Sequence, residues 1–287
     1  DKLIDTVHRN LGLLHRYVKL RKKALKLDEL HMYDLYVPIV DEPKKHIYYE
    51  EALDLVKKGL RPLGDEYAGY LENAFKSGWI DVFENQGKTS GAYSWGAYMT
   101  HPYVLLNYQG TVNDVFTIAH EMGHAMHSFY TNKTQPYIYS EYKIFVAEVA
   151  STVNEALLIK YMLDNTDNKA EKAYLLNHHL EGFRGTLFRQ VMFAEFEKII
   201  HEKVEEGQAL TCQTLCDIYH KLNEKYFGDE IVIDKDIDME WARIPHFYSS
   251  FYVYKYATGF SAAMSLSQQI LSEGLPAVER YINFLSS

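Results

Sequence analysis

The chain has 287 residues, 47% of them hydrophobic and 24% charged, which excludes intrinsic disorder and allows a large buried core. Its 30 Lys and Arg against 39 Asp and Glu give a formal charge of -9, so nucleic acids and anionic membrane surfaces are poor partners. No apolar run is long enough to cross a bilayer, and two cysteines exclude a disulfide framework, so we expect a reducing, cytoplasmic location.

Apolar residues recur mostly at spacings of three and four, which predicts a mainly α protein. Residues 80–109 differ, because glycines and aromatics there predict a Gly-rich loop and one or two strands. No repeat or linker-like stretch interrupts the chain, so we expect one domain over residues 1–287 with a small β insert. The expected helices are 3–27, 48–58, 63–76, 112–131, 139–165, 169–206, 211–227 and 247–272.

One short motif indicates which chemistry the protein performs. Residues 120–124 read His-Glu-Met-Gly-His, the pattern H-E-x-x-H. On a helix, the imidazoles of His120 and His124 share a face and can bind one zinc ion. Glu121 then lies beside the ion and can take a proton from a water molecule. A zinc hydrolase is favoured over a surface helix with two solvated histidines.

The surroundings of the motif support this interpretation. Thr111 and Asp114 form a capping-box pattern just upstream, which predicts a helix start. Apolar residues at helical spacing follow the cap, and the β-rich segment precedes it, so a strand can lie alongside the metal helix. The expected fold class is therefore mainly α with a small β insert, built around the motif helix.

A catalytic zinc ion needs a third protein ligand and one open position. A third histidine on the same stretch is excluded, because Tyr130 stands where that histidine is needed. Glu148 and Glu155 lie seven residues apart on one helical face among apolar and small residues, where carboxylates are costly unless something positive faces them. We assign Glu148 to the metal and Glu155 to orienting a ligand histidine. Glu141 or Glu155 as the ligand is the alternative.

Three other features give weaker signals. Residues 87–93 are Gly-rich and fit a flexible lid, or a strand edge that pairs with peptide backbone, rather than a phosphate loop. Cys212 and Cys216, one helical turn apart, could in principle hold a metal, but without further cysteines helix packing is favoured. His127 is interpreted as a packing histidine.

A run of aromatic residues lies near the C-terminal end. By propensity its alternating tyrosines suit a strand, whereas its flanks suit tight helix packing or a loop. Stabilising an oxyanion at zinc requires a hydrogen-bond donor, which a phenol or an imidazole supplies. His246 and Tyr254 are the preferred donors, with Tyr248 and Tyr252 as further substrate contacts. Packing of amphipathic aromatics is the alternative.

The motifs together resemble the oligoendopeptidase F group of the thimet-oligopeptidase-like family of zinc metallopeptidases. The resemblance covers essentially the whole chain and rests on residues 120–128, 145–148, 244–248 and 251–259. It implies a mainly α, zincin-like helical metallopeptidase domain with a small β insert. It also implies a deep channel that admits short peptides and excludes folded proteins. Members of the family are roughly twice this length, so the chain resembles their C-terminal, catalytic half.

Matched motif by motif, the resemblance implies His120, His124 and Glu148 as zinc ligands and Glu121 as the general base. It also implies that the His and Tyr residues of the C-terminal motif contact the substrate and the tetrahedral intermediate. The spacing in that motif differs slightly from the one in thimet oligopeptidase, so which tyrosine does which task stays open.

The predicted function is a zinc endopeptidase that holds one Zn²⁺ per chain and hydrolyses internal bonds of short oligopeptides. A helical zinc carboxypeptidase and a general proteinase are alternatives that use the same motif. A further alternative is a peptide-binding zinc domain, inactive without a missing N-terminal half. The expected partners are short peptides and that missing half, with no nucleic acid and no membrane.

Overall fold

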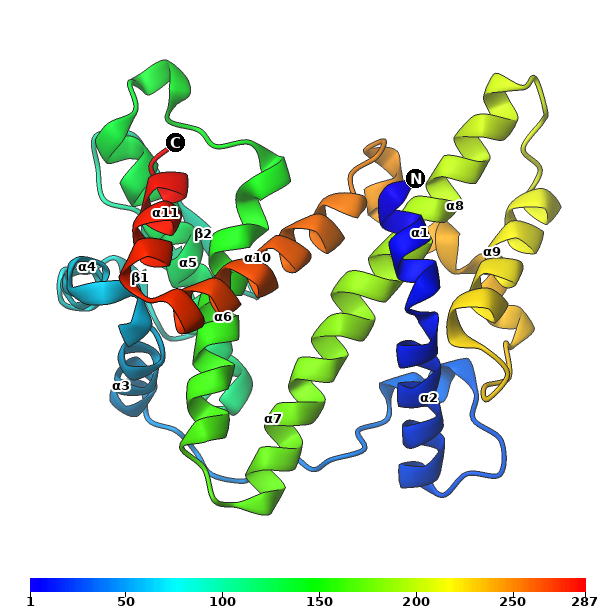
Figure 1. The fold of residues 1–287 in the computed structure, drawn as a ribbon, viewed down its shortest axis with the longest axis horizontal. Helices are drawn as coiled ribbons and strands as arrows, with labels where there is room; N and C mark the ends of the chain where they lie inside the picture. The colour runs from blue at the N-terminus through cyan, green and yellow to red at the C-terminus, as the bar shows by residue number, and fades with distance from the viewer. The chain divides into compact units, whose positions relative to one another are not determined.

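The computed structural model describes residues 1–287, which group into two compact units (Figure 1). Each unit is built from two separate stretches of chain. Unit 1 contains Asp1–Asp41 and Asn177–Thr258, and unit 2 contains Glu42–Leu176 and Gly259–Ser287. Two of the boundaries fall inside long helices, α7 (Lys169–Gly182) and α10 (Tyr254–Glu273). One catalytic domain over residues 1–287 stays a prediction.

Unit 1 is helical, and its core lies where α1 and α2 pack against α8 and α9. Val18, Phe196 and Tyr226 are among its most deeply buried side chains. Besides parts of α7 and α10, its elements are α1 (Lys2–Arg9), α2 (Leu11–Leu25), the 3₁₀ helix η1 (Met32–Tyr36), the π-helical segment η5 (Phe183–Phe188), α8 (Arg189–Glu205), α9 (Cys212–Phe227) and the 3₁₀ helices η6 (Lys235–Arg243) and η7 (Pro245–Tyr248).

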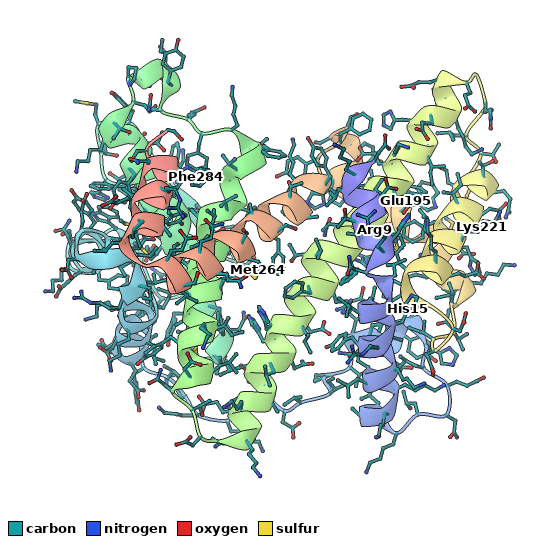
Figure 2. All side chains as sticks on the ribbon, in the orientation of Figure 1. Arg9, His15, Glu195, Lys221, Met264 and Phe284 are labelled. Carbon is teal, nitrogen blue, oxygen red and sulfur yellow. The ribbon has the colours of Figure 1, made fainter.

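Two buried carboxylates join the helices of unit 1. Glu195 on α8, labelled in Figure 2, accepts hydrogen bonds from Lys225 at 3.0 Å and Tyr226 at 2.7 Å and lies 2.6 Å from His8. Glu240 accepts from Arg189 at 2.7 Å and from Tyr219 at 2.6 Å, and Arg243 also contacts it. Charged and phenolic donors surround both groups, so neither carboxylate is buried without a partner.

Unit 2 carries the small sheet and the helices that pack on it. The strands are β1 (Ile80–Asp81), β2 (Tyr93–Trp95) and β3 (Tyr103–Leu105), in the order β1-β3-β2, with β1 parallel and β2 antiparallel to β3. Its helices, besides parts of α7 and α10, are α3 (Tyr49–Gly59), α4 (Gly64–Lys76), α5 (Val112–Thr134), α6 (Ala147–Asp164) and α11 (Leu275–Leu285), with the 3₁₀ turns η2 (Arg61–Leu63), η3 (Tyr137–Tyr139) and η4 (Ile144–Val146).

The mainly α class with a small β insert is confirmed, and four expected helices need correction. The helix expected over 3–27 is two helices, because the backbone leaves helical geometry at Asn10 with ψ at 7°. The helix expected from 139 begins only at Ala147, and the one expected from 247 begins at Tyr254. The stretch expected as one helix over 169–206 runs from Lys169 to Glu205 with the π-helical turn η5 inside it. Helix α11 and the 3₁₀ helix η6 were not expected.

No helix of the chain combines the length and the apolar character needed to cross a membrane.

Candidate metal centre

The start of α5 fixes the phase of the H-E-x-x-H motif. The hydroxyl of Thr111 accepts a hydrogen bond from the backbone N–H of Asp114 at 3.1 Å, and the Asp114 carboxylate accepts from the backbone N–H of Thr111 at 2.8 Å. This is the expected reciprocal cap, which satisfies two donors that a helix start leaves free. Three turns further on, His120 and His124 lie on the same side of α5.

A close crossing of α5 and α6 brings the carboxylates of α6 next to the histidines of α5. Gly123 allows it, because a Cβ atom there would lie 2.5 Å from the Cα of Ser151 and 2.7 Å from the carbonyl oxygen of Ala150. The Asn154 amide donates to the carbonyl oxygen of Ala119 at 2.9 Å across the same crossing, and the Tyr67 hydroxyl donates to the Asn154 side chain at 3.1 Å. The crossing therefore holds α6 in register against the motif.

Three ligand atoms face one another at the crossing. The Nε2 atoms of His120 and His124 are 3.2 Å apart, and an Oε2 atom of Glu148 lies 3.5 Å from the first and 3.6 Å from the second. Tetrahedral ligands at zinc bond lengths of about 2.0–2.2 Å lie roughly 3.3–3.6 Å from one another. The three atoms thus have the spacing of ligands on one zinc-sized ion. Glu141, the other candidate ligand, has an exposed side chain and is not in this cluster.

Each ligand has a second contact that orients it. Nδ1 of His120 donates to the Glu155 carboxylate, and the His124 imidazole bonds to the backbone of Ala147. The Ser151 hydroxyl donates to Glu148 at 3.3 Å. Because both imidazoles use one nitrogen as a donor, each turns the lone pair of Nε2 towards the centre. A cation fits this arrangement.

The carboxylates give the pocket a negative electrostatic potential. Burial alone would lower the pKa of His120, but its hydrogen bond to Glu155 and the nearby carboxylates raise it to about 9. Burial and the neighbouring charge on His120 lower the pKa of His124 to about 4. One positive charge is therefore stabilised here and a second one is not. The pocket therefore favours a positive charge at its centre, and a metal ion that binds there takes the place of the proton on His120.

Glu121 is buried beside the cluster, with 7% of its surface exposed. One of its carboxylate oxygens, Oε2, has no hydrogen-bond partner. Burial is the main cause that raises its pKa above the ordinary value of a glutamate. A buried carboxylate with a free oxygen next to a metal pocket is a candidate proton acceptor.

His127 packs behind the cluster rather than facing it. Its ring stacks on Tyr142 with the ring centres 3.7 Å apart, and Phe284 of α11, labelled in Figure 2, lies 5.4 Å away. Burial and the nearby His124 lower the pKa of His127 to about 3, so the ring is neutral. Its place agrees with a packing histidine.

The four aromatic site candidates from the C-terminal motif belong to unit 1, whereas the metal cluster belongs to unit 2. The run forms no strand: Pro245–Tyr248 is a 3₁₀ turn, and α10 begins at Tyr254. Within the run, His246 lies 5.6 Å from the Tyr252 ring and the Tyr248 side chain is 91% exposed. The roles of His246, Tyr248, Tyr252 and Tyr254 stay predictions.

A buried carboxylate holds the loop that carries these tyrosines. Glu197 of α8 is 2% exposed, and its Oε1 accepts the backbone N–H of Phe251 at 2.5 Å. Phe251 has a φ of 55°, in the left-handed region that side chains other than glycine seldom adopt. The hydrogen bond thus holds a strained turn directly before Tyr252 and Tyr254.

The Gly-rich segment 87–93 leads into β2, at the edge of the sheet. The Asn107 side chain donates to the carbonyl oxygens of Thr89 and Gly91, at 2.9 and 2.8 Å. The segment is therefore held at one point to the chain that follows β3. β2 pairs with β3 on one side, and Trp95 at its end is 68% exposed.

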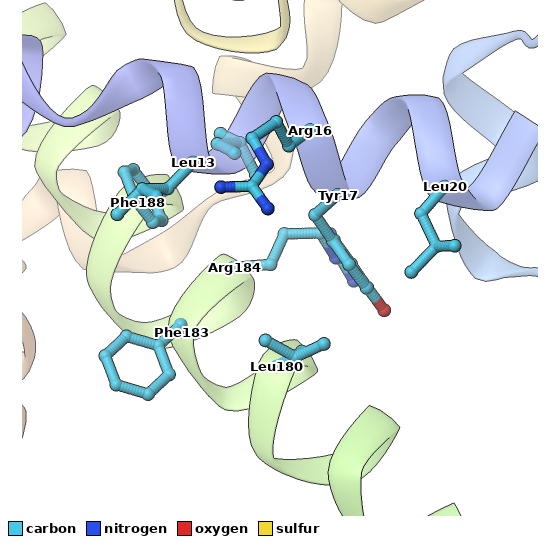
Figure 3. A pocket seen from close by; sticks show the side chains of 9 residues that line it. Leu13, Arg16, Tyr17, Leu20, Leu180, Phe183, Arg184 and Phe188 are labelled. Carbon is cyan, nitrogen blue, oxygen red and sulfur yellow. The ribbon is translucent and has the colours of Figure 1, made fainter. Parts of the chain in front are cut away.

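Unit 1 contains a hollow between α2 and the helical stretch around residue 183, shown in Figure 3. Its volume is about 540 Å³, and none of the predicted site residues lines it. Leucines and phenylalanines form most of the wall, and Arg184 there is paired with Glu181 at 2.9 Å.

Sequence analysis missed several residues that build the centre. Gly123 stood inside the motif as an unassigned position, although a glycine within a helix is a signal of close packing. Ser151 gave the same signal, as a small polar residue on the face of the segment that carries Glu148 and Glu155, and Asn154 did so on the adjoining face. The stacking of Tyr142 on His127 had no counterpart in the sequence.

Comparison with known proteins places the chain in a family. The model of Peptidase family M3 matches residues 1–287. Oligopeptidase PepF from Bacillus subtilis is 58% identical over 287 residues, covering 100% of this chain and 43% of that protein. The chromosomal oligoendopeptidase F of Lactococcus lactis subsp. cremoris is 46% identical, covering 100% of this chain and 48% of that protein.

A solved structure gives the same result for the fold. A putative peptidase from Chlamydophila abortus superposes with a TM-score of 0.92 at 46% identity, covering 100% of this chain and 48% of that one. The chain thus spans about half the length of the relatives it matches. Its sequence matches the family model throughout and its fold matches a relative, so the chain belongs to peptidase family M3.

Proposed function

We propose that this chain is the catalytic part of a zinc-dependent endopeptidase that hydrolyses internal bonds of short oligopeptides. The observation that carries the proposal is the cluster of His120, His124 and Glu148, with the free carboxylate oxygen of Glu121 beside it. The names of the relatives, oligopeptidase and oligoendopeptidase, support peptides as the substrate class. Short peptides of the cytoplasm are the proposed substrates.

Zinc is the metal that fits the donors best. Two imidazoles and one carboxylate are a common catalytic set for this ion, which then keeps one open position. When bound, zinc supplies Lewis acidity and lowers the pKa of a water molecule to about 7. His120, His124 and Glu148 would hold it, and Glu155 would keep the His120 ring in its orientation.

The side chains of the protein then move the protons and position the substrate. Glu121 accepts the proton of the attacking water and passes it to the leaving amine. His246 and Tyr254 donate hydrogen bonds to the oxygen that becomes negative in the transition state. Tyr248 and Tyr252 are further contacts of the peptide substrate.

The test is cleavage of an internally quenched peptide of about ten residues by the 287-residue chain. Zinc is added in one arm and a chelator in the other, and the products are identified by mass. We expect chelator-sensitive cleavage at an internal bond. Stepwise trimming from the C-terminus would instead identify a carboxypeptidase, and digestion of casein at a similar rate would identify a general proteinase.

Exchanging Glu121 for Gln tests the proton acceptor. The amide keeps the size of the side chain but cannot take a proton, so we expect zinc to stay bound and turnover to fall by about 100-fold or more. Zinc content is measured by atomic absorption and turnover with the quenched peptide. Glu279→Gln, on the exposed side of α11, is the matched control. Near-normal turnover of Glu121→Gln would remove Glu121 from the reaction.

A second candidate is a peptide-binding zinc domain that needs further chain for catalysis. The observation that favours it is the coverage of about half of each relative. One zinc ion per chain, peptide binding and no cleavage would identify this function. Addition of the remaining half of a relative, supplied as a separate polypeptide, would then restore cleavage.

A further inference from the structure

Three sulfur atoms meet on the surface of unit 1. Cys212 and Cys216 lie one turn apart on α9, and Met239 on η6 faces them. The Sδ atom of Met239 is 3.3 Å from the Sγ atom of Cys216 and 3.9 Å from that of Cys212. Neither cysteine forms a disulfide. Only the two cysteines could be grouped from the sequence, because Met239 lies more than twenty residues after Cys216.

The fold fixes Met239 in this position. Its two chain neighbours are both bonded to α9: Asp238 accepts from His220 at 2.6 Å, and Glu240 accepts from the Tyr219 hydroxyl at 2.6 Å. A residue between two such anchors has little freedom to move along the helix. The thioether is therefore placed over the two thiols by the packing of η6 on α9, not by its own flexible side chain.

The cluster is unlike a packing contact. Sulfur side chains that only fill space are usually buried, whereas Cys212 is exposed and Met239 is 49% exposed. In addition, the indole N–H of Trp241 is buried without an oxygen or nitrogen acceptor and lies against Cys216. A donor aimed at sulfur is the kind of contact that stabilises a thiolate bound to a metal.

We propose that Cys212, Cys216 and Met239 form a binding site for a soft metal ion of the copper(I) class. Thiolates and thioethers are soft ligands that suit copper(I), and the thioether distinguishes this set from the thiolate and imidazole sets that bind zinc. With metal–sulfur bonds of about 2.3 Å, sulfurs around a three-coordinate ion lie roughly 4.0 Å apart. The Cys212–Met239 distance of 3.9 Å is close to this value, and the Cys216–Met239 distance of 3.3 Å has to lengthen by about 0.7 Å.

This site is independent of the proposed peptidase centre. It uses sulfur ligands from unit 1, whereas the zinc cluster uses nitrogen and oxygen ligands from unit 2. Soft and hard ligand sets separate the two ions by chemistry. A chain loaded with zinc is therefore expected to keep its zinc while it takes up copper(I).

The test is an anaerobic titration of the zinc-loaded chain with copper(I) in competition with a chromophoric copper(I) chelator. We expect one copper(I) per chain, retention of zinc, and a thiolate-to-metal absorption band in the ultraviolet. X-ray absorption at the copper edge is expected to give three sulfur neighbours. No competition with the chelator, or a first shell of nitrogen and oxygen, would overturn the proposal.

Two variants distinguish copper(I) binding at the three-sulfur site from binding to any accessible thiol. Met239→Leu conserves volume and is expected to weaken copper(I) binding by about tenfold or more, with an unchanged circular dichroism spectrum. Cys216→Ser leaves one thiolate and the thioether, and is expected to lower the copper(I) affinity and weaken the absorption band. Met99→Leu, an exposed methionine of unit 2, is the control and is expected to bind as the parent chain does. Equal binding by Met239→Leu and the parent chain would show that no three-sulfur site forms.

Discussion

Glu155 tests the metal pocket at the level of one side chain. Its carboxylate accepts the Nδ1 proton of His120, and Glu155→Gln replaces that acceptor with a neutral amide. We expect the zinc dissociation constant to rise by about 10–100-fold, because the ring loses its orienting partner and part of its basicity. Competition with a zinc-sensitive dye measures the change.

The control for this experiment also tests the alternative third ligand. Glu141 has an exposed side chain outside the cluster, so Glu141→Gln is expected to leave the zinc affinity unchanged. If Glu141→Gln lost zinc and Glu155→Gln did not, the assignment of the carboxylates would be reversed.

Glu197 positions a backbone turn, whereas Glu155 orients a histidine. The prediction for Glu197 rests on the proposed function. Glu197→Ala removes the acceptor for the Phe251 backbone, so the strained turn relaxes and the following tyrosines shift. We expect turnover of the quenched peptide to fall by up to about 100-fold with an unchanged zinc affinity. Glu197→Gln, which still offers an oxygen, is expected to restore most of the turnover.

Glu202→Ala, on an exposed part of the same helix, is the matched control for Glu197. Equal turnover of Glu197→Ala and Glu202→Ala would show that the turn at Phe251 holds its shape without the carboxylate, or that the tyrosines take no part in the reaction.

At the scale of elements, the crossing of α5 and α6 depends on Gly123. Gly123→Ala places a methyl group against the α6 backbone, which cannot rotate out of the way, so the helices must separate. We expect a loss of about 1–3 kcal/mol in the free energy of unfolding and weaker zinc binding, because α6 carries Glu148. Urea denaturation and dye competition measure the two effects.

Gly69→Ala on α4 gives the comparison, since no atom lies near the added methyl group. Alanine is the better helix former there, so stability is expected to rise by about 0.5–1 kcal/mol. A similar small gain at Gly123 would mean that the two helices are not in the close contact described.

Local signals in the sequence identified some elements and not others. The capping pair at Thr111 marked the start of α5 because the contacts that begin that helix lie within four residues. The start of α6 was placed too early because Ile138, Tyr139 and Ile144 continue a helical spacing although their side chains are exposed. The break at Asn10 has no proline beside it, and the signal from Asn10 and Gly12 is too weak to interrupt the apolar pattern.

Some residues of the candidate centre could likewise be predicted from the sequence, and others could not. His120, Glu121 and His124 could be found because one helix carries all three at a fixed spacing. Glu148 required a helix phase and a choice among carboxylates, which the resemblance also supplied. The sulfur cluster could not be found, because its third member comes from a 3₁₀ helix that the apolar pattern does not reveal.

At the scale of the whole molecule, the stability of unit 1 is expected to depend on pH through Glu240. Burial alone would raise the pKa of Glu240, but Arg189, Tyr219 and Arg243 outweigh it and hold the pKa below the ordinary value. A carboxylate with a depressed pKa in the folded state stabilises the fold above its unfolded pKa, and this stability is lost as the pH falls through the folded value. Unit 1 is therefore expected to lose stability below about pH 5.

Glu240→Gln tests this expectation. The variant is expected to lose about 3–5 kcal/mol at pH 7, because Arg189 stays buried without its counter-charge, and to show a smaller further loss between pH 7 and pH 4. Urea denaturation at both pH values measures the difference. Glu224→Gln, exposed on α9, is the control. An equal loss on acidification in the parent chain and in Glu240→Gln would show that other groups govern the acid response.

The C-terminal end of the metal helix is bonded to residues made much later by the ribosome. The Thr131 hydroxyl donates to the carbonyl oxygen of Leu285 at 2.9 Å, and the hydroxyl of Thr134 and the side chain of Gln135 both donate to that of Ser286. While the nascent chain lacks these residues, the hydroxyls of α5 have no such acceptors. Unit 2 therefore cannot form all of its packing contacts when its H-E-x-x-H motif emerges from the ribosome. All of unit 1 is translated before residues 259–287, which complete unit 2, so the proposed metal pocket is expected to become stable only late in biogenesis.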